Sequence, residues 1–224
     1  MIDHEIATTL WLTLKLAAIT TILLLLISTP FAWWLANNKS RYKPVIEALV
    51  GLPLVLPPTV LGFYLLIAFS PQNAFGESWL QLTGFQLAFS FTGLVIGSMI
   101  YSLPFVVQPL QATFQQLGHK PIEAAALLGA GPLDRFKSVI LPLSAHGFLS
   151  AGVLGFAHTI GEFGVVLMIG GNIPGETQVA SILIFDQVES LAYDQAHLLS
   201  GILLFGTFAL LLLTYSSRKV FFKH

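Results

Sequence analysis

Apolar residues come in long runs, which are much longer than the strands or half-buried helices of a soluble protein need. Five runs each reach roughly 20 residues or more, the length that a helix needs to cross the hydrocarbon core of a bilayer. They cover about Leu10–Ala36, Val45–Ser70, Leu87–Gln111, Val139–Gly170 and His197–Tyr215. Because lipid cannot satisfy exposed backbone polar groups, each run is expected to be helical. The pattern predicts an all-α integral membrane protein with five transmembrane helices, forming a single domain over residues 1–224.

A sixth apolar stretch, Val179–Leu191, is too short to span a membrane. We expect it to form a short helix at the outer face or a re-entrant helix. The first run does not read as a cleaved signal peptide, since its preceding flank, MIDHE, is acidic and its basic cluster follows it.

The basic residues predict the topology. They follow the first run, separate the third from the fourth, and close the chain: Lys39, Arg41, Lys43, Lys120, Arg135, Lys137, Arg218, Lys219 and Lys223. The other two connections, residues 71–86 and 171–196, contain acids but neither lysine nor arginine. Under the positive-inside rule, this asymmetry places the N-terminus outside and the C-terminus inside, which requires an odd number of spans.

Composition agrees with lipid as the surrounding solvent. Of the 224 residues, 55% are hydrophobic and 9% are charged, whereas soluble domains usually carry about a quarter charged residues. A net charge of −1 argues against nucleic acid as a partner. The absence of cysteine excludes disulfides and thiolate metal sites. We expect no cofactor, no resident metal and no catalytic residue.

Prolines interrupt the second run in the string GLPLVLPPTVLGFYLL, which contains Pro53, Pro57 and Pro58. Each proline removes a backbone donor and clashes with the preceding turn. In lipid such breaks persist where neighbouring helices or a wet cavity satisfy the freed carbonyls. Two interpretations stay open, a kink in a transport pathway or a passive packing kink. On the first, Pro57, Pro58 and Thr59 are candidates for the pathway or its gate.

The fourth run contains an intramembrane carboxylate, Glu162, four residues after His158. That spacing places both on one helix face, and an ionisable residue at membrane depth is a functional candidate. Glu162 could line a pathway or gate, stabilise a bend near the outer end, or pair with His158. Two ligands are too few for a usual metal site. Lys15, within the first run, could attract anions or snorkel to the interface.

The polar stretch IEAAALLGAGPLDRFKSVILPL, Ile122 to Leu143, faces the cytoplasm on this topology. Pro121 and Glu123 suit the first turn of a helix, and Gly129 and Gly131 are expected to end it. Pro132 then begins a second helix. The result is a compact helix–turn–helix, which reads either as a docking element for another protein or as an amphipathic interfacial loop without a partner.

The spacing of this stretch resembles the EAA loop of permease subunits of binding-protein-dependent ABC importers. That pattern is EAA, three residues, Gly, nine residues, Ile, one residue, Leu-Pro, and Val139 stands at the Ile position. The resemblance implies a MetI-like permease fold, with residues 118–142 as the cytoplasmic loop that couples to the ATPase. The coupling residues are then Glu123, Ala124, Ala125, Gly129, Gly131, Leu141 and Pro142.

Within that superfamily, LPLVLPPTVLGFYLL and GEFG followed by NIPGET resemble molybdate importer permeases, the ModB type. This resemblance implies a non-enzymatic, multi-pass subunit of the bacterial inner membrane. It implies as partners a second permease copy, a cytoplasmic ATPase dimer and a periplasmic oxyanion-binding protein. No GxxxxGK[ST] phosphate loop is present, so ATP hydrolysis must come from a partner.

Two alternatives to molybdate import stay open. The first is a permease for another oxyanion, tungstate or sulfate, since substrate selection is expected mainly at the binding protein. The second is a proton-coupled secondary transporter that uses His158 and Glu162. An intramembrane enzyme has no support, since the sequence contains neither HExxH nor GxSxG.

Overall fold

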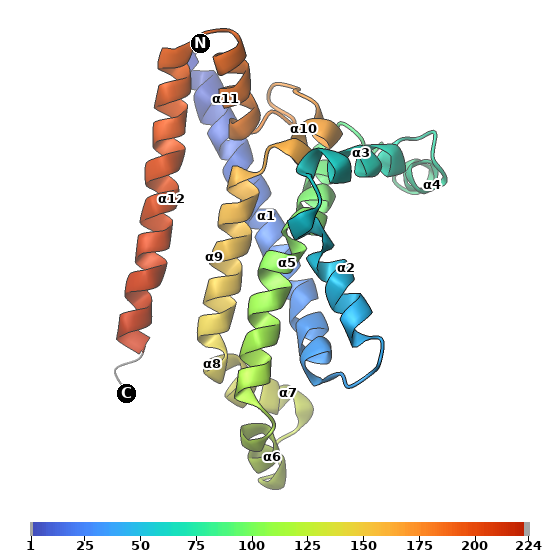
Figure 1. Ribbon diagram of the computed structural model, residues 1–224, viewed down its shortest axis with the longest axis vertical. Coiled ribbons are helices and arrows are strands. Elements are labelled where there is room, and N and C mark those ends of the chain that lie inside the picture. Colours follow the sequence, from blue (N-terminus) through green and yellow to red (C-terminus); the bar gives the residue numbers. More distant parts are fainter. Residues whose placement is uncertain (1, 222–224) are drawn as a thin grey trace.

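The computed structural model describes residues 2–221, with side chains for residues 5–212, 214 and 216, and these residues form helices and connections without any strand. The long helices run lengthwise (Figure 1): α1 (Ile2–Asn37), α5 (Phe91–Leu117), α9 (Ala145–Gly161) and α12 (Tyr193–Phe221). The shorter helices are α2 (Lys43–Val55), α3 (Pro58–Phe69), α4 (Ala74–Thr83), α6 (Lys120–Leu127), α7 (Pro132–Arg135), α8 (Leu141–Leu143), α10 (Gly164–Gly170) and α11 (Ala180–Glu189), and a π-helical turn covers Phe136–Ile140.

Helices α1, α5 and α9 pack against one another and form the centre of the molecule. Two apolar clusters lie along them. One cluster surrounds Leu94 and Ile169 at the predicted outer end, and the other surrounds Val106 and Leu110 nearer the predicted cytoplasmic end. Small residues allow these helices to approach closely, as is usual between membrane helices.

The second apolar run forms two helices, α2 and α3, and the kink predicted from its prolines is a sharp break between them. Leu56 and Pro57 separate them, both with extended backbone (ψ 137° and 133°), because a residue that precedes proline avoids the helical conformation. The two axes differ in direction by 109°. In consequence α3 lies across the long axis of the molecule (Figure 1) and packs against α10.

The fourth apolar run is shorter as a span than predicted. The segment Pro132–Leu143 meets α9 at a bend of 72°, and α9 ends at Gly161, where Glu162 is extended with ψ 131°. The residues beyond Glu162 form a separate short helix, α10. The prediction of a continuous span over Val139–Gly170 is therefore wrong at both ends.

The stretch Val179–Leu191 contains a short helix, α11, as predicted. Helix α11 packs against the first third of α1 and the start of α12 through Ile6, Ala180, Leu183 and Leu199. The backbone N–H of Ala180 donates to the Thr13 hydroxyl at 2.8 Å. These contacts join the beginning and the end of the chain.

Among the described residues, three helices are long and apolar enough to cross a membrane, and the total reaches five if each of the two bent pairs counts as one span. Helix α1 begins and α12 ends at opposite ends of the molecule (Figure 1), as an odd number of spans requires. Which end faces the cytoplasm stays a prediction. Part of the basic cluster that supports this orientation, namely Lys223 and the side chains of Arg218 and Lys219, lies outside the described part of the structure.

Candidate functional site

A cavity of about 440 Å³ lies where α3, α5, α9 and α10 meet, near the predicted outer end. It is lined by Pro58, Thr59, Tyr101, Ala157, His158, Gly161, Glu162, Phe163 and Gly164. The fold thus brings four of the five predicted pathway residues together from two distant segments. The fifth, Pro57, is not part of the lining; it precedes α3 and shapes the bend.

Two helix ends form one wall of this cavity. A Cβ atom on Gly164, the first residue of α10, would lie 2.7 Å from the Cβ of Pro58, the first residue of α3. Gly62 on α3 has the same relation to Met168 on α10, at 2.8 Å. Since no other residue fits these approaches without a shift, the glycines allow α3 and α10 to pack tightly beside the cavity.

Glu162 is 3% exposed, and neither of its carboxylate oxygens has a hydrogen-bond partner among the described residues. Its backbone is held, since the carbonyl accepts from the Ser181 hydroxyl at 2.6 Å and the N–H donates to the Thr159 carbonyl at 3.4 Å. A buried ionisable group without a partner is costly, and inside a membrane it marks a functional site. The carboxylate borders the cavity at the point where α9 breaks.

His158 faces α5 and not Glu162. Its Nδ1 shares a hydrogen bond of 2.8 Å with the Ser102 hydroxyl, and its ring stacks on Phe105 with centroids 3.9 Å apart. Both residues line the cavity, but the predicted alternative of a bond between them is not seen, since the described residues provide no hydrogen-bond partner for either Glu162 carboxylate oxygen. His158 instead connects the two helices α5 and α9 at the cavity.

Lys15 lies elsewhere, on an exposed face of α1. Its ammonium group is 4.7 Å from the centroid of the Phe91 ring, at the start of α5. This is cation–π geometry between two helices, and it places the charge outside the cavity. Among the described residues, no three His, Cys, Asp or Glu side chains come together to bind a metal.

The EAA stretch forms a second site at the opposite end of the molecule (Figure 1). Helix α6 starts at Lys120 with Pro121 and Glu123 in its first turn. Gly129 ends the segment with a φ of +88°, and the Ala130 N–H returns to the Ala125 carbonyl at 3.0 Å. This is the left-handed closure that glycine allows at a helix end.

Gly131 has a different role from the one predicted. Its φ is −71°, so it does not adopt the left-handed conformation, and it precedes α7 as the N-cap residue. Asp134 in α7 accepts a hydrogen bond from the Ser138 hydroxyl at 2.8 Å. The chain then passes through the π-helical turn and α8, which contains Leu141 and Pro142, into α9.

The tip of the EAA stretch exposes leucine side chains that the sequence reasoning did not single out. Leu127 and Leu128 are 90% and 89% exposed, and Leu133 is 66% exposed. Ile122 and Phe136, by contrast, pack against the apolar cluster between α5 and α9. The stretch therefore has an anchored base and an apolar tip. The signal in the sequence is three leucines around the glycine turn of a polar loop.

These features together define a helical membrane subunit with broken helices beside a cavity and a structured loop at the other end. The chain belongs to the family of binding-protein-dependent transport system inner membrane components, whose model matches residues 28–221. It is 54% identical over 97% of its length to the molybdenum transport system permease protein ModB of Azotobacter vinelandii, of which it covers 96%. It is 36% identical over 93% of its length to a probable sulfate transport system permease protein of Zygnema circumcarinatum, of which it covers 72%.

The fold has a solved counterpart. A bacterial alginate ABC transporter, in complex with an alginate pentasaccharide-bound periplasmic protein, matches with a TM-score of 0.74. The match covers 96% of this chain and 78% of that one at 16% sequence identity. The comparison confirms the predicted ABC importer permease fold, and the family confirms the inner membrane as its location.

Proposed function

We propose that this chain is the permease subunit of an ATP-driven importer of molybdate. The assignment of molybdate as the substrate rests on sequence identity. The chain is 54% identical to a molybdenum permease over nearly the full length of both chains, compared with 36% identity to the sulfate relative. The strings around Pro57 and Glu162, which carried the resemblance in the sequence, border the same cavity or shape its wall.

The proposal includes three partners: a second copy of the chain, a cytoplasmic ATPase dimer and a periplasmic binding protein. The family description names dependence on a binding protein, and the solved alginate transporter is a complex with a periplasmic protein. The chain has no phosphate-loop motif for ATP. Hydrolysis is therefore assigned to the partner, and the chain itself acts as a non-enzymatic pore subunit.

Coupling is assigned to the EAA stretch because of what it connects. Helix α6 follows α5 after two residues, and the second half of the stretch leads directly into α9. These same helices line the cavity through Tyr101 and His158 and are joined by the bond from Ser102 to His158. A displacement of the stretch by the ATPase would move both helices relative to each other at the cavity.

The docking surface would combine two kinds of residue. The small residues Ala124, Ala125, Gly129 and Gly131 leave a smooth face, and Leu127 and Leu128 present apolar side chains at the tip. Glu123 stands in the first turn of α6, where a carboxylate stabilises the helix through the helix dipole. Its role is to order the loop and not to contact nucleotide.

The gate is assigned to the cavity. Pro58 and Thr59 begin α3, Glu162 separates α9 from α10, and both helix breaks face the same space. Broken helices of this kind mark transport sites, because irregular backbone inside a membrane is stable only next to protein or water. An oxyanion could pass only after α3 and α10 separate, since Gly164 and Pro58 hold them in contact.

The test is reconstitution of the chain with its ATPase and binding protein, followed by uptake of labelled molybdate. We expect uptake that requires ATP and both partners, with competition by tungstate at similar concentrations and by sulfate only at concentrations at least about tenfold higher. A preference for sulfate would overturn the substrate. Proton-driven uptake by the chain alone would overturn the class and favour a secondary transporter.

A further inference from the structure

One face of α5 stays uncovered below the cavity. Helix α5 buries Val106, Val107, Leu110 and Phe114 against α1 and α9. The face on the other side begins with Tyr101 in the cavity lining. At 3.6 residues per turn, Gln108 and Gln115 lie within about 40° of Tyr101 around the helix axis, and both glutamines are exposed.

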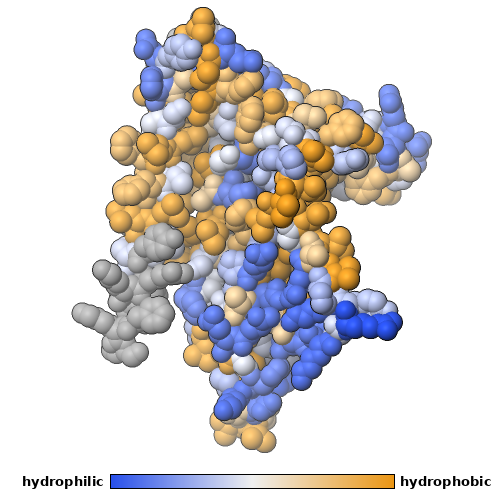
Figure 2. All heavy atoms as spheres, viewed as in Figure 1, coloured by the Kyte–Doolittle hydropathy of each residue, from blue (hydrophilic) through white to orange (hydrophobic). Residues whose placement is uncertain are grey.

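Glutamine at this depth is unfavourable next to lipid. Gln108 lies nine residues before the end of α5, or roughly 14 Å along the helix, within a segment apolar enough to span a membrane. Polar side chains in such segments face the bundle interior or a water-filled space and not the acyl chains. Figure 2 shows hydrophilic residues gathered over the lower part of this side of the molecule, below a more apolar upper part.

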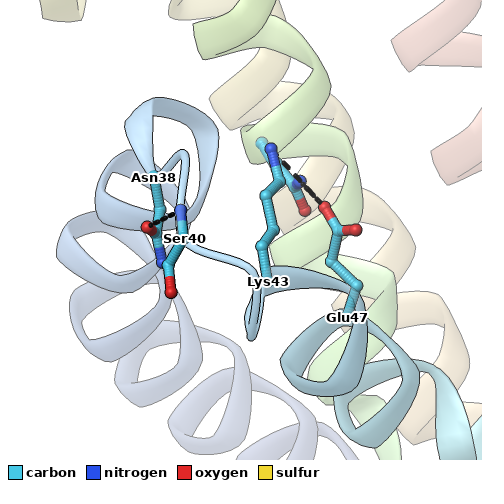
Figure 3. Close-up of polar contacts among 5 residues, drawn as sticks. Asn38, Ser40, Lys43 and Glu47 are labelled. Carbon is cyan, nitrogen blue, oxygen red and sulfur yellow. Dashed lines mark hydrogen bonds and ion pairs between the residues drawn. The ribbon is translucent and has the colours of Figure 1, made fainter.

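Helix α2 borders this face without covering it. Opposite Gln108 stands Gly51, whose Cβ, if present, would lie 3.8 Å from the Gln108 Nε2. One turn below Gly51, Glu47 accepts a hydrogen bond of 2.6 Å from Gln111 Nε2. Lys43 approaches the same carboxylate at 3.8 Å, and Figure 3 shows Lys43 and Glu47 side by side on α2. The contact holds α2 against α5 and balances the negative charge beside the face.

We propose that Gln108 lines the inner half of the permeation pathway and donates amide hydrogen bonds to the oxyanion as it leaves the cavity. This inference deepens the proposed function and rests on it. A neutral amide offers two N–H donors and no positive charge. Conduction needs sites that bind strongly enough for entry and weakly enough for exit, and an amide next to a charge-balanced pair meets both needs.

The experiment uses the absence of native cysteine, which makes an introduced thiol unique within this chain, and labelling is measured on this chain after it is separated from its partners. A Gln108→Cys variant, assembled with its ATPase and binding protein in inverted membrane vesicles, is treated with a negatively charged, membrane-impermeant methanethiosulfonate. We expect labelling at least about tenfold faster than for Phe208→Cys, a position 61% exposed on the apolar surface of α12. Molybdate at high concentration should slow the labelling of Gln108→Cys.

The outcomes separate this inference from the proposed substrate. Labelling that molybdate does not slow would support the pathway position and count against molybdate as the cargo. Labelling as slow as that of Phe208→Cys would overturn the inference, since the face would then contact lipid. A spontaneous disulfide between two Gln108→Cys copies without labelling would also overturn it, because the face would then be a dry seam between subunits.

A second variant pair tests the amide itself. Gln108→Leu keeps the size of the side chain and removes its donors, so we expect the rate of ATP-dependent uptake to fall at least about fivefold. Gln108→Asn retains the amide and should recover most of that loss. Equal uptake by Gln108→Leu and the unchanged protein would contradict the assigned role.

Discussion

Gly147 shows how closely the central helices of this permease approach each other. A Cβ atom at this position would lie 2.2 Å from the Thr113 hydroxyl and 2.7 Å from the Thr113 Cβ. Thr113 cannot turn away easily, because its hydroxyl donates to the Pro109 carbonyl at 2.8 Å. The contact therefore requires glycine on α9, for reasons of space and not of backbone conformation.

The Gly147→Ala variant is expected to lose up to about 2 kcal/mol of unfolding free energy, since overpacking costs about 1–3 kcal/mol and the gain in helix propensity offsets about 1 kcal/mol of that cost. Unfolding titrations in detergent measure the change. The matched control is Gly201→Ala on α12, where no atom lies within 4 Å of the added Cβ. That variant should be neutral or slightly more stable, and equal losses in both would contradict the packing argument.

At the cavity, the sequence singled out residues but not the contacts that they make. Glu162 and His158 were identified as candidates from their depth in an apolar run, and both line the cavity. Their partners could not be predicted, because spacing places residues on a helix only while the helix continues. The bond from His158 to Ser102 joins residues 56 positions apart, and no local pattern specifies such a pair.

Among the elements, the EAA stretch was predictable in outline because its signals are local. Proline at the start of each short helix and glycine between them act within one turn of backbone. The sequence did not separate Gly129 from Gly131, although only Gly129 needs a positive φ. The prolines indicated a kink in the second run but not its angle, and the break between α9 and α10 was missed because the pattern of apolar residues continues through it.

The Gly129→Val variant is expected to reduce both ATPase association and molybdate uptake at least about tenfold. A β-branched residue at a φ of +88° is strained by about 1–3 kcal/mol, and the strain would open the tip that presents Leu127 and Leu128. Co-purification and uptake by proteoliposomes measure the two effects. The control, Gly84→Val, carries similar strain at φ +80° in the connection at the other end. Full molybdate uptake by Gly129→Val, with normal ATPase association, would contradict the proposal that the EAA stretch couples the permease to the ATPase.

For the molecule as a whole, the orientation in the membrane is a prediction from charge alone. Lys39 lies in the basic connection between α1 and α2, and Glu77 lies in α4, within a connection free of basic residues; both are exposed. The positive-inside rule places Lys39 in the cytoplasm and Glu77 outside.

Single cysteines test this orientation, because the unchanged chain provides a blank without thiols. An impermeant maleimide added to intact spheroplasts should label Glu77→Cys and should label Lys39→Cys only after the membrane is permeabilised. The reverse labelling pattern would show that the protein has the opposite orientation in the membrane. It would also place the EAA stretch outside, where no ATPase could reach it.

The sequence by itself determined the class of this protein. The class follows from lipid as solvent, helical spans, the distribution of charge and the spacing of the EAA stretch. Residues close together in the chain specify these features, because hydropathy, capping and turn preferences act over one or a few turns. The tertiary structure decided how sharply the spans bend, which polar residues share a cavity, and which face of α5 stays uncovered. Those features depend on contacts between distant segments, such as Gly164 with Pro58 and Gln111 with Glu47, and such contacts exist only once the helices have packed.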